Sequence, residues 1–198
     1  RILDASEVGL AGGADVDGLL VVDADTAYLS FAGNAGTNVP GVGSVQDEDV
    51  VRYDAGVWSL VFDGSDVGLG ETNAEDVDAF EVLGDGSIVV STFGTPDLPD
   101  LAGEARQDLF RCQGGLGTDT TCTWSFYLDA SDVGLTQGGE NVDGAAVGTD
   151  GIYLSVTESF SVAGLSGADE DVFLCSGPVT GEASSCGVFA LFFDGSAN

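Results

Sequence analysis

The sequence predicts an all-β protein made of three tandem four-stranded antiparallel units, each of about 65 residues. Three observations predict this fold class. A short acidic motif recurs along the chain, short runs rich in Val, Leu, Phe and Tyr alternate with Gly-rich turns, and no window shows the apolar stripe of an amphipathic helix.

The repeated motif is Asp63-Gly-Ser-Asp-Val-Gly-Leu69. It reappears as Asp4-Ala-Ser-Glu-Val-Gly-Leu10 and as Asp129-Ala-Ser-Asp-Val-Gly-Leu135, and a shortened copy is Asp194-Gly-Ser196. These copies predict a single repeat domain over residues 1–198, with units at approximately 1–62, 63–128 and 129–198.

Four strands are expected in each unit, in the same order. The first strand follows an acidic entry, and in the second unit the turn Gly84-Asp85-Gly86 joins it to the next strand as a tight hairpin. A long loop containing Gly or Pro then leads to the third and fourth strands. The expected strands are 16–22, 27–31, 50–53 and 58–62, then 77–83, 87–92, 108–112 and 123–128, and finally 142–147, 152–156, 172–175 and 189–193.

The fourth strands show alternation with a period of two, which places every second side chain on one face. This pattern predicts a shared apolar face for three sets of residues, which are Trp58, Leu60 and Phe62, then Trp124, Phe126 and Leu128, and then Phe189, Leu191 and Phe193.

Repeated four-stranded units without helices are typical of propeller blades, so a β-propeller-like body or a threefold prism-like body is expected. Three blades are fewer than the usual minimum of four. The chain is therefore either a closed three-unit body or half of a larger ring that a second chain completes, and the sequence favours neither.

Four cysteines flank the third-to-fourth-strand turns of two equivalent units. Cys112 and Cys122 lie in the second unit, and Cys175 and Cys186 in the third. This symmetry predicts the disulfides Cys112–Cys122 and Cys175–Cys186, although a zinc site is an alternative. Disulfides indicate an oxidising, extracellular or cell-surface setting.

The composition excludes several classes of function. Asp and Glu number 34 against 4 Lys and Arg, which gives a net charge of −30, so nucleic acid and anionic lipid are not expected partners. His and Lys are absent, which removes His-based triads and P-loop lysines. No apolar stretch is long enough for a transmembrane helix, and the sequence does not begin with a signal peptide, although its first residue could be a mature end left by cleavage.

The carboxylates are the candidate chemical groups. The repeated motif and the acidic entry to the next strand together offer several hard oxygens, which Ca²⁺ prefers. Asp76 and Asp78 are expected on one side of their strand with Asp63 and Asp66 nearby, and the equivalent residues Asp17, Asp78 and Asp143 are expected to ring the pseudo-symmetry axis. The candidate metal ligands are Asp4, Glu7, Asp15, Asp17, Asp63, Asp66, Asp76, Asp78, Asp129, Asp132, Asn141 and Asp143.

Turn formation and solubility are two alternative roles for these acids. Asp and Asn side chains form turns by accepting hydrogen bonds from nearby backbone N–H groups. An acidic surface also keeps a protein soluble, for example in high salt.

A further acidic cluster precedes the third strand as Asp47-Glu48-Asp49 and Asp169-Glu170-Asp171, but the second unit has Arg106-Gln107-Asp108 there.

Three stretches carry a family resemblance: Phe62-Asp-Gly-Ser-Asp-Val-Gly-Leu69, Glu75-Asp-Val-Asp-Ala79 and Gly167-Ala-Asp-Glu-Asp-Val-Phe173. Together they resemble a repeat of uncharacterised secreted bacterial proteins. The resemblance covers nearly the whole chain and implies secretion and a repeat fold, with no established activity.

These observations favour a non-catalytic, calcium-binding extracellular repeat protein with a structural or adhesive role, such as a cell-surface or filament subunit. Ile2 and Leu3 duplicate the end of a fourth strand, and they could pair with the exposed edge of the third unit of the same chain or extend a neighbouring subunit. Self-association is expected because three units are fewer than the usual number for closure. A carbohydrate- or protein-binding module that uses the long loops is the alternative. A carboxylate-based glycoside hydrolase is less favoured, because a catalytic pair should be unique whereas these acids recur in every unit.

Overall fold

The computed structural model describes residues 4–33, 36–70 and 72–197. The structure is all-β with antiparallel sheets, which confirms the predicted class. The described residues contain no α-helix, and their helical segments are the short 3₁₀ turns η1 (Ser65–Val67), η2 (Asn73–Glu75) and η3 (Gly195–Ala197). None of these helices has the length and apolar character needed to span a bilayer.

Three four-stranded sheets follow one another along the chain, each at the place of one predicted unit. Sheet 1 consists of β1 (Val16–Val21), β2 (Thr26–Phe31), β5 (Val50–Asp54) and β6 (Val57–Phe62). Sheet 2 consists of β7 (Ala79–Val82), β8 (Ile88–Ser91), β9 (Leu109–Gln113) and β10 (Thr123–Leu128). Sheet 3 consists of β11 (Val142–Gly148), β12 (Gly151–Val156), β15 (Val172–Ser176) and β16 (Val188–Phe193).

Two small hairpins lie in the long loops after the second strands of sheets 1 and 3. They pair β3 (Thr37–Val39) with β4 (Gly43–Val45), and β13 (Phe160–Val162) with β14 (Leu165–Gly167). The sequence predicted only loops here, because each strand is three residues long and shows little periodicity.

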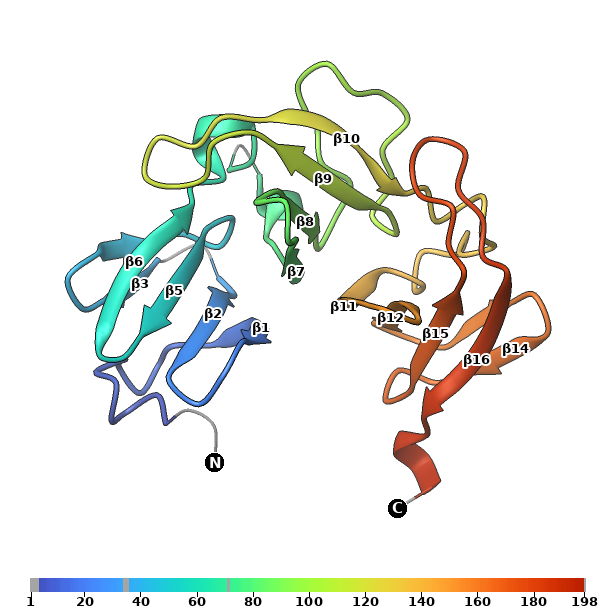
Figure 1. Cartoon of the computed structure of the whole chain (residues 1–198), viewed down its shortest axis with the longest axis horizontal. Coiled ribbons are helices and arrows are strands. Elements are labelled where there is room, and N and C mark those ends of the chain that lie inside the picture. The colour runs from blue at the N-terminus through green and yellow to red at the C-terminus, as the bar shows by residue number, and fades with distance from the viewer. Residues whose placement is uncertain (1–3, 34–35, 71, 198) are drawn as a thin grey trace.

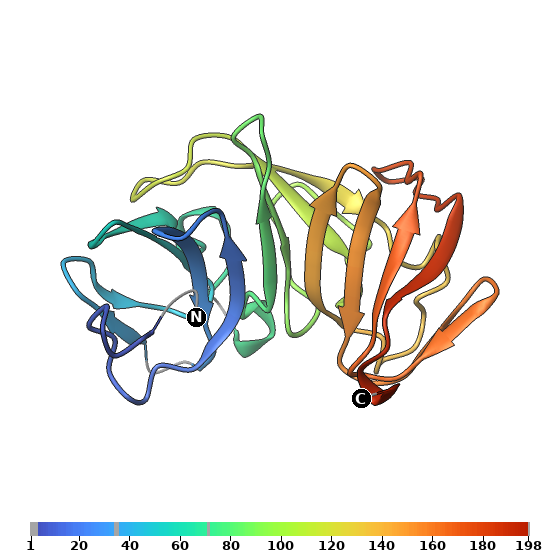
Figure 2. The ribbon, with the colours of Figure 1, turned by 60° about the horizontal axis from the view of Figure 1, so that its bottom comes forward.

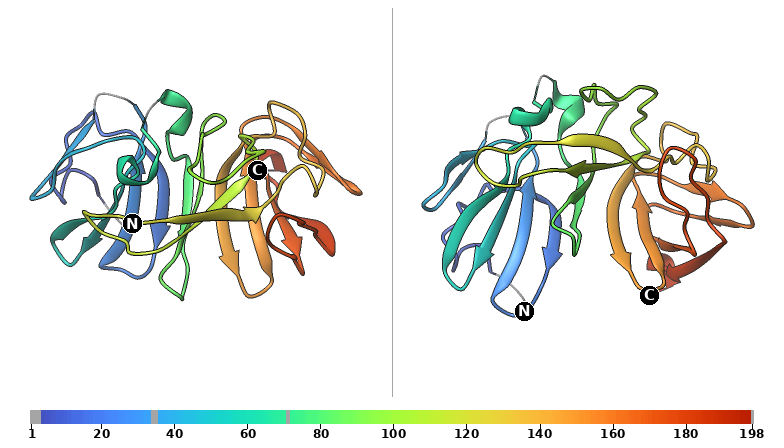
Figure 3. Two further views of the ribbon diagram at one scale, coloured as in Figure 1. Left: turned by 90° about the horizontal axis from the view of Figure 1, so that it is seen from above. Right: turned by 45° about the horizontal axis from the view of Figure 1, so that its top comes forward.

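The three sheets stand side by side along an open arc, with β1, β7 and β11 on its inner side (Figure 1). Neighbouring inner strands contact one another, β1 with β7 and β7 with β11. The other views show the same succession of sheets (Figures 2 and 3). The four-stranded sheets of the described chain thus form neither a closed propeller nor a threefold prism.

Each sheet has two faces, which we name by their neighbours. The leading face points toward the preceding sheet in the sequence, and the trailing face points toward the following sheet. The trailing residues Val50 and Phe62 of sheet 1 pack in one cluster with the leading residues Phe80, Ile88 and Phe110 of sheet 2. Sheets 2 and 3 form an equivalent core, so the apolar residues on facing sides of successive sheets are buried between them.

The expected single apolar face of the fourth strands is wrong. A register shift next to Val61 puts Trp58 on the leading face and Phe62 on the trailing face, where they join different clusters. The same shift separates Phe126 from Leu128. It also occurs in β16, between the residues paired with Val172 and with Phe173. A β-bulge inserts one residue and so reverses the alternation beyond it, which a strict period of two cannot anticipate.

The two predicted disulfides are present. Cys112 is bonded to Cys122 with a Cα–Cα distance of 5.0 Å, and Cys175 to Cys186 with 5.3 Å. No cysteine among the described residues is free. Both bridges close the loop between the third and fourth strands, and disulfides of this kind are typical of oxidising compartments.

Candidate metal centre

Three equivalent aspartates from the inner side of the arc line one cavity. Asp17, Asp78 and Asp143 border a space of about 390 Å³ together with Phe93, Ser155 and Thr157. The first strands of sheets 1 and 3 carry a register shift at this point, between Val16 and Leu19 in β1 and between Val142 and Gly144 in β11. Such a bulge re-aims a side chain out of the regular alternation. The structure therefore brings together the three residues that the sequence placed around an axis.

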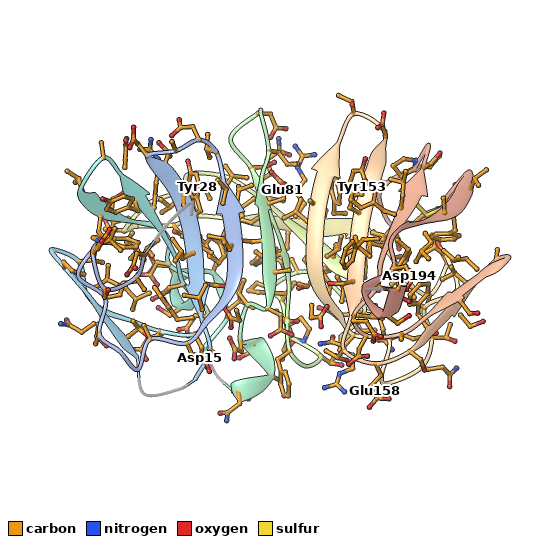
Figure 4. All side chains as sticks on the ribbon, turned by 90° about the horizontal axis from the view of Figure 1, so that it is seen from below. Asp15, Tyr28, Glu81, Tyr153, Glu158 and Asp194 are labelled. Atoms are coloured by element: carbon orange, nitrogen blue, oxygen red, sulfur yellow. A yellow bond between two sulfur atoms is a disulfide. The ribbon has the colours of Figure 1, made fainter. Side chains whose placement is uncertain are left out.

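The two ends of the inner strands can be told apart in Figure 4. Asp15, which precedes β1, and Glu158, which follows β12, lie at one end, whereas Tyr28, Glu81 and Tyr153 lie toward the other end (Figure 4). Asp17 and Thr157 of the cavity are close in sequence to the first two of these residues.

The closest carboxylates meet at the junction of sheets 1 and 2. Asp17, Asp76 and Asp78 each offer an oxygen, and these oxygens lie within 4.8 Å of one another. Asp76 lies just before β7 and shares its side of the chain with Asp78, as the alternation predicts. Asp17 enters from β1 of the preceding sheet, so the cluster joins two sheets that are separate in sequence.

Two oxygens of this cluster lack a hydrogen-bond donor. Asp17 Oδ1 accepts hydrogen bonds from Gly18 N at 2.7 Å and from Ser30 Oγ at 2.6 Å. Asp17 Oδ2 and Asp76 Oδ1, in contrast, are buried and unpartnered. A buried carboxylate oxygen without a donor is costly, so this contact is stable only with a shared proton or a bound cation.

The pKa values of the cluster respond to this crowding. Burial raises the pKa of Asp76 to about 8, and the charges of Asp17, Asp47 and Asp78 add to the effect. Burial, followed by the charge of Asp17, raises the pKa of Asp78 to about 7. Burial also raises the pKa of Asp17, against the opposing hydrogen bond from Ser30. The cluster therefore holds its charge poorly without a counter-ion.

At the junction of sheets 2 and 3, an amide takes the place of one of the crowded carboxylates. Asn141 stands in sheet 3 at the position of Asp76, and its Nδ2 donates to Asp78 Oδ2 at 3.2 Å. Asn141 is only 2% exposed, and its Oδ1 is buried without a partner. One junction therefore pairs a carboxylate with an amide, whereas the other sets Asp76 against Asp17 with no donor between them.

The positive charge that acts on the cluster comes from a side chain that is already engaged. Arg106 lowers the pKa of Asp78, in opposition to the effects of burial and of Asp17. Its guanidinium donates to the backbone oxygens of Phe93 at 2.9 Å and of Gly138 at 3.4 Å. Carboxylate and amide oxygens around a small cavity form a donor set of the kind that binds Ca²⁺.

The predicted ligands in the repeated motif form hydrogen bonds between sheets. Asp63 N donates to Thr120 Oγ1 and Thr120 N donates to Asp66 Oδ2, both at 2.9 Å. In the next junction Asp129 N donates to Ser184 Oγ, and Ser184 N donates to Asp132 Oδ2, again at 2.9 Å. We call each reciprocal pair a clamp, because it ties the motif at the end of one sheet to the disulfide-bridged loop of the next sheet. The expected grouping of Asp63 and Asp66 with Asp76 and Asp78 is not formed.

The first copy of the motif also forms a turn. Asp4 Oδ1 accepts from Ser6 N at 2.9 Å and from Glu7 N at 3.3 Å, and the side chain of Glu7 is exposed. Asp15 is exposed as well, and its backbone oxygen accepts from Ala32 N at 2.9 Å. None of these three residues belongs to the carboxylate group at the sheet 1–sheet 2 junction. The strand end at Ile2 and Leu3 lies outside the described residues.

A repeated structural aspartate was not predicted from the sequence. Asp49, Asp108 and Asp171 each stand directly before a third strand, and each accepts two backbone hydrogen bonds, one of them from the motif that follows the fourth strand of the same sheet. The donors are Gln46 and Gly64 for Asp49, Ala105 and Ala130 for Asp108, and Ala168 and Gly195 for Asp171. Burial raises the pKa values of Asp49 and Asp108 to about 6. In the sequence, an Asp followed by Val or Leu recurs directly before the third strand of all three units, and this pattern could have identified the residue.

A larger cavity of about 510 Å³ lies beside β10. It is lined by residues that include Arg111, Trp124, Tyr127 and Glu182. Trp124 is only 7% exposed, and its Nε1 donates to the backbone oxygen of Val67 at 2.9 Å, so its ring is not presented as a platform for a sugar.

No protein-family model, curated protein or solved structure matches this chain. The function proposed below therefore rests on the geometry of the site and on the composition of the chain.

Proposed function

We propose that this chain is a non-catalytic, calcium-binding β-repeat protein that works outside the cell as a structural or adhesive component. In this proposal its sheets act as blades of a propeller-like body, and calcium fastens the inner strands of sheets 1 and 2 to each other. One observation carries the proposal, which is the meeting of Asp17, Asp76 and Asp78 across that junction with two buried, unpartnered oxygens.

Calcium suits this cluster on chemical grounds. It takes six to eight oxygen ligands in flexible geometry, and water can complete a shell begun by three carboxylates. A divalent cation also removes the mutual repulsion that raises the pKa values of Asp76 and Asp78. The junction with Asn141 supports this argument, because there a hydrogen bond from an amide already relieves Asp78.

A hydrolytic role for the same carboxylates has less support. Asp17, Asp78 and Asp143 recur at one position of every sheet, whereas an acid and a nucleophile occupy different environments in a glycosidase. The carbohydrate-binding alternative needs an exposed aromatic platform, and the Trp124 ring at the larger cavity is buried. A structural role for the bound ion is the simpler proposal.

The extracellular setting and the self-association belong to the same proposal. Two disulfides and a net charge of −30 support a protein that works outside a reducing compartment and remains soluble there. A protein with repeated sheets and an apolar face at one end of the series is suited to assembly with copies of itself.

The test is calcium titration by calorimetry, together with thermal unfolding in calcium and in chelator. Wild-type protein is expected to bind calcium and to unfold at a higher temperature in its presence, since a ligand of the native state stabilises by mass action. Asp76→Asn is expected to lose the response and to resemble the Asn141 junction. Asn141→Asp is expected to add a second binding event.

The matched control is Asp66→Asn, which removes one charge from the clamp but keeps an oxygen that accepts from Thr120 N. This variant should bind calcium as the wild type does. A wild-type protein whose unfolding temperature is the same in calcium and in chelator would contradict the proposal. So would a calcium response that is lost in Asp66→Asn and kept in Asp76→Asn.

A further inference from the structure

The trailing face of sheet 3 carries a row of residues without charge. A row of paired residues crosses this face as Ala146, Tyr153, Leu174 and Ala190. The corresponding rows carry Arg52 in sheet 1 and Glu81 and Arg111 in sheet 2. Those charged rows belong to faces that a following sheet borders, whereas the chargeless row borders the opening of the arc. A solvent-facing side of an antiparallel sheet normally carries polar residues.

Exposure shows what this face lacks. Phe193 is 49% exposed, although its counterparts Phe62 and Leu128 are fully buried by the following sheet. Phe192, which is 65% exposed, stacks its ring edge against Tyr153 with 4.7 Å between centroids. In a chain with a net charge of −30, an exposed aromatic face of this kind indicates a surface that a partner covers.

The leading face of sheet 1 is open along its inner strand β1, whereas its residues on β2, β5 and β6 are buried under the N-terminal motif and the β3–β4 hairpin. Leu19 is 54% exposed, whereas Phe80, at the same position in β7, is 4% exposed because it packs beside Gly18 of the preceding sheet. Val16 is likewise exposed, although its counterparts Val77 and Val142 are fully buried. The inner strand of sheet 1 therefore presents the surface that in sheets 2 and 3 rests on a trailing face.

Both halves of the clamp are missing at these two faces together. The motif after β16 has Ala197 at the position of Asp66 and Asp132, so it lacks the carboxylate that receives the clamp. Sheet 1 joins β5 to β6 through Ala55 and Gly56 alone, so it lacks the loop that would reach such a carboxylate. A partner sheet with a clamp loop would find no carboxylate after β16 to accept its backbone N–H. Sheet 1 has no clamp loop, so it can pack there without that carboxylate.

We propose that the trailing face of sheet 3 packs against the leading face of sheet 1 in a second copy of this chain. The contact is head to tail, and two copies close one six-sheet ring by making it twice. By equivalence with the junction of sheets 1 and 2, where Phe62 lies against Trp124 and Phe80 lies beside Gly18, Phe193 then lies against Trp58 of the other copy. Leu19 of that copy lies beside Gly144 of sheet 3. This inference rests on the self-association in the proposed function.

The test measures the mass of the 198-residue chain in solution by sedimentation over a wide range of concentration. The wild type is expected to form a dimer. Phe193→Asp and Leu19→Asp are each expected to weaken the dimer at least about 100-fold, because each buries an unpaired charge in both contacts of the ring. Val57→Asp, at an exposed apolar residue of β6 outside both faces, is the matched control and should leave the dimer intact.

Mixing the two interface variants tests the head-to-tail arrangement. A mixture of Phe193→Asp with Leu19→Asp restores one intact contact and should yield a mixed dimer that neither variant forms alone. Either substitution, if it failed to fold, would show an altered circular dichroism spectrum, and Phe192→Asp or Val16→Asp would replace it. A wild-type monomer overturns the inference. A dimer that forms equally well with Leu19→Asp also overturns the inference, although self-association itself would then be supported. Calcium titration of the same samples tests the metal site separately.

Discussion

Asp76 and Asn141 occupy the same place in two junctions. Their side chains differ in one atom, because an amide nitrogen of Asn141 replaces a carboxylate oxygen of Asp76. Asn141 donates a hydrogen bond to the aspartate that it meets, whereas Asp76 meets Asp17 without any donor. The chain thus contains its own comparison between a junction that is complete with protein atoms alone and one that needs a proton or a cation.

The raised pKa values predict how the metal-free protein responds to pH. Asp76 and Asp78 have pKa values of about 8 and about 7 in the folded state, against about 4 in an unfolded chain. A raised folded-state pKa contributes stability that is complete below the unfolded value and is lost as the pH rises through the folded value. In chelator, the unfolding temperature should therefore fall between about pH 4 and about pH 8.

Calcium and a variant separate this cluster from other buried acids. Glu48, Asp49 and Asp108 also have raised pKa values and add to the fall. Calcium binds the deprotonated ligands, so it should reduce the fall in the wild type and leave that of Asp76→Asn unchanged. Scanning calorimetry across the pH range measures this difference. Identical profiles for the wild type in calcium and in chelator would refute the assignment.

At the scale of an element, each disulfide-bridged loop is hydrogen-bonded to the motif that follows the preceding sheet. Each loop supplies a hydroxyl that accepts from the preceding motif, through Thr120 in one junction and Ser184 in the other. These hydroxyls also donate within their own loops, to the backbone oxygens of Gly117 at 2.7 Å and of Gly181 at 2.6 Å. In both sheets the disulfide closes the loop that carries this hydroxyl.

Thr120→Val is expected to lower the free energy of unfolding by about 1–3 kcal/mol, since it leaves the backbone N–H of Asp63 without an acceptor in a buried place. Urea unfolding followed by tryptophan fluorescence measures the change. Thr123→Val is the control, because Thr123 is exposed at the start of β10 and Val suits a strand. Equal stabilities of the two variants would show that the clamp contributes little.

The elements also show how far the sequence predicts the structure. The strands were found because period-two alternation and Gly-rich turns are local signals, and the cysteine pairing followed from the repeat. The faces of Phe62, Leu128 and Phe193 were missed because a bulge is set by the packing of neighbouring sheets, and no local pattern reports it.

The site was predicted with a similar division. Equivalence between the units suggested that Asp17, Asp78 and Asp143 lie near one another, and the structure places them around one cavity. Sequence proximity grouped Asp63 and Asp66 with Asp76 and Asp78, whereas the structure places Asp63 and Asp66 beside Thr120, which is more than fifty residues away and could not be identified from the chain alone. The metal itself stays a prediction.

At the scale of the whole molecule, the excess of acids makes stability depend on ionic strength. A net charge of −30 repels itself, and the screening length shortens from roughly 30 Å at 0.01 M salt to roughly 8 Å at 0.15 M. Sodium chloride should therefore raise the unfolding temperature gradually. Calcium chloride at equal ionic strength should raise it further in the wild type and not in Asp76→Asn. Unfolding temperatures that are independent of sodium chloride would show that the charges are already balanced by local contacts.

The two-residue turn between β5 and β6 has a mechanical consequence. In sheets 2 and 3 a covalent bridge spans the corresponding turn, with sequence separations of 10 and 11 residues, so these stretches cannot be drawn out by a force along the chain. Sheet 1 has no such bridge and no clamp loop of its own among its described residues, so under tension it is the sheet free to unravel over its full length. In the structural role that we propose, sheet 1 would be the extensible part, and the two bridged sheets would keep their loops closed.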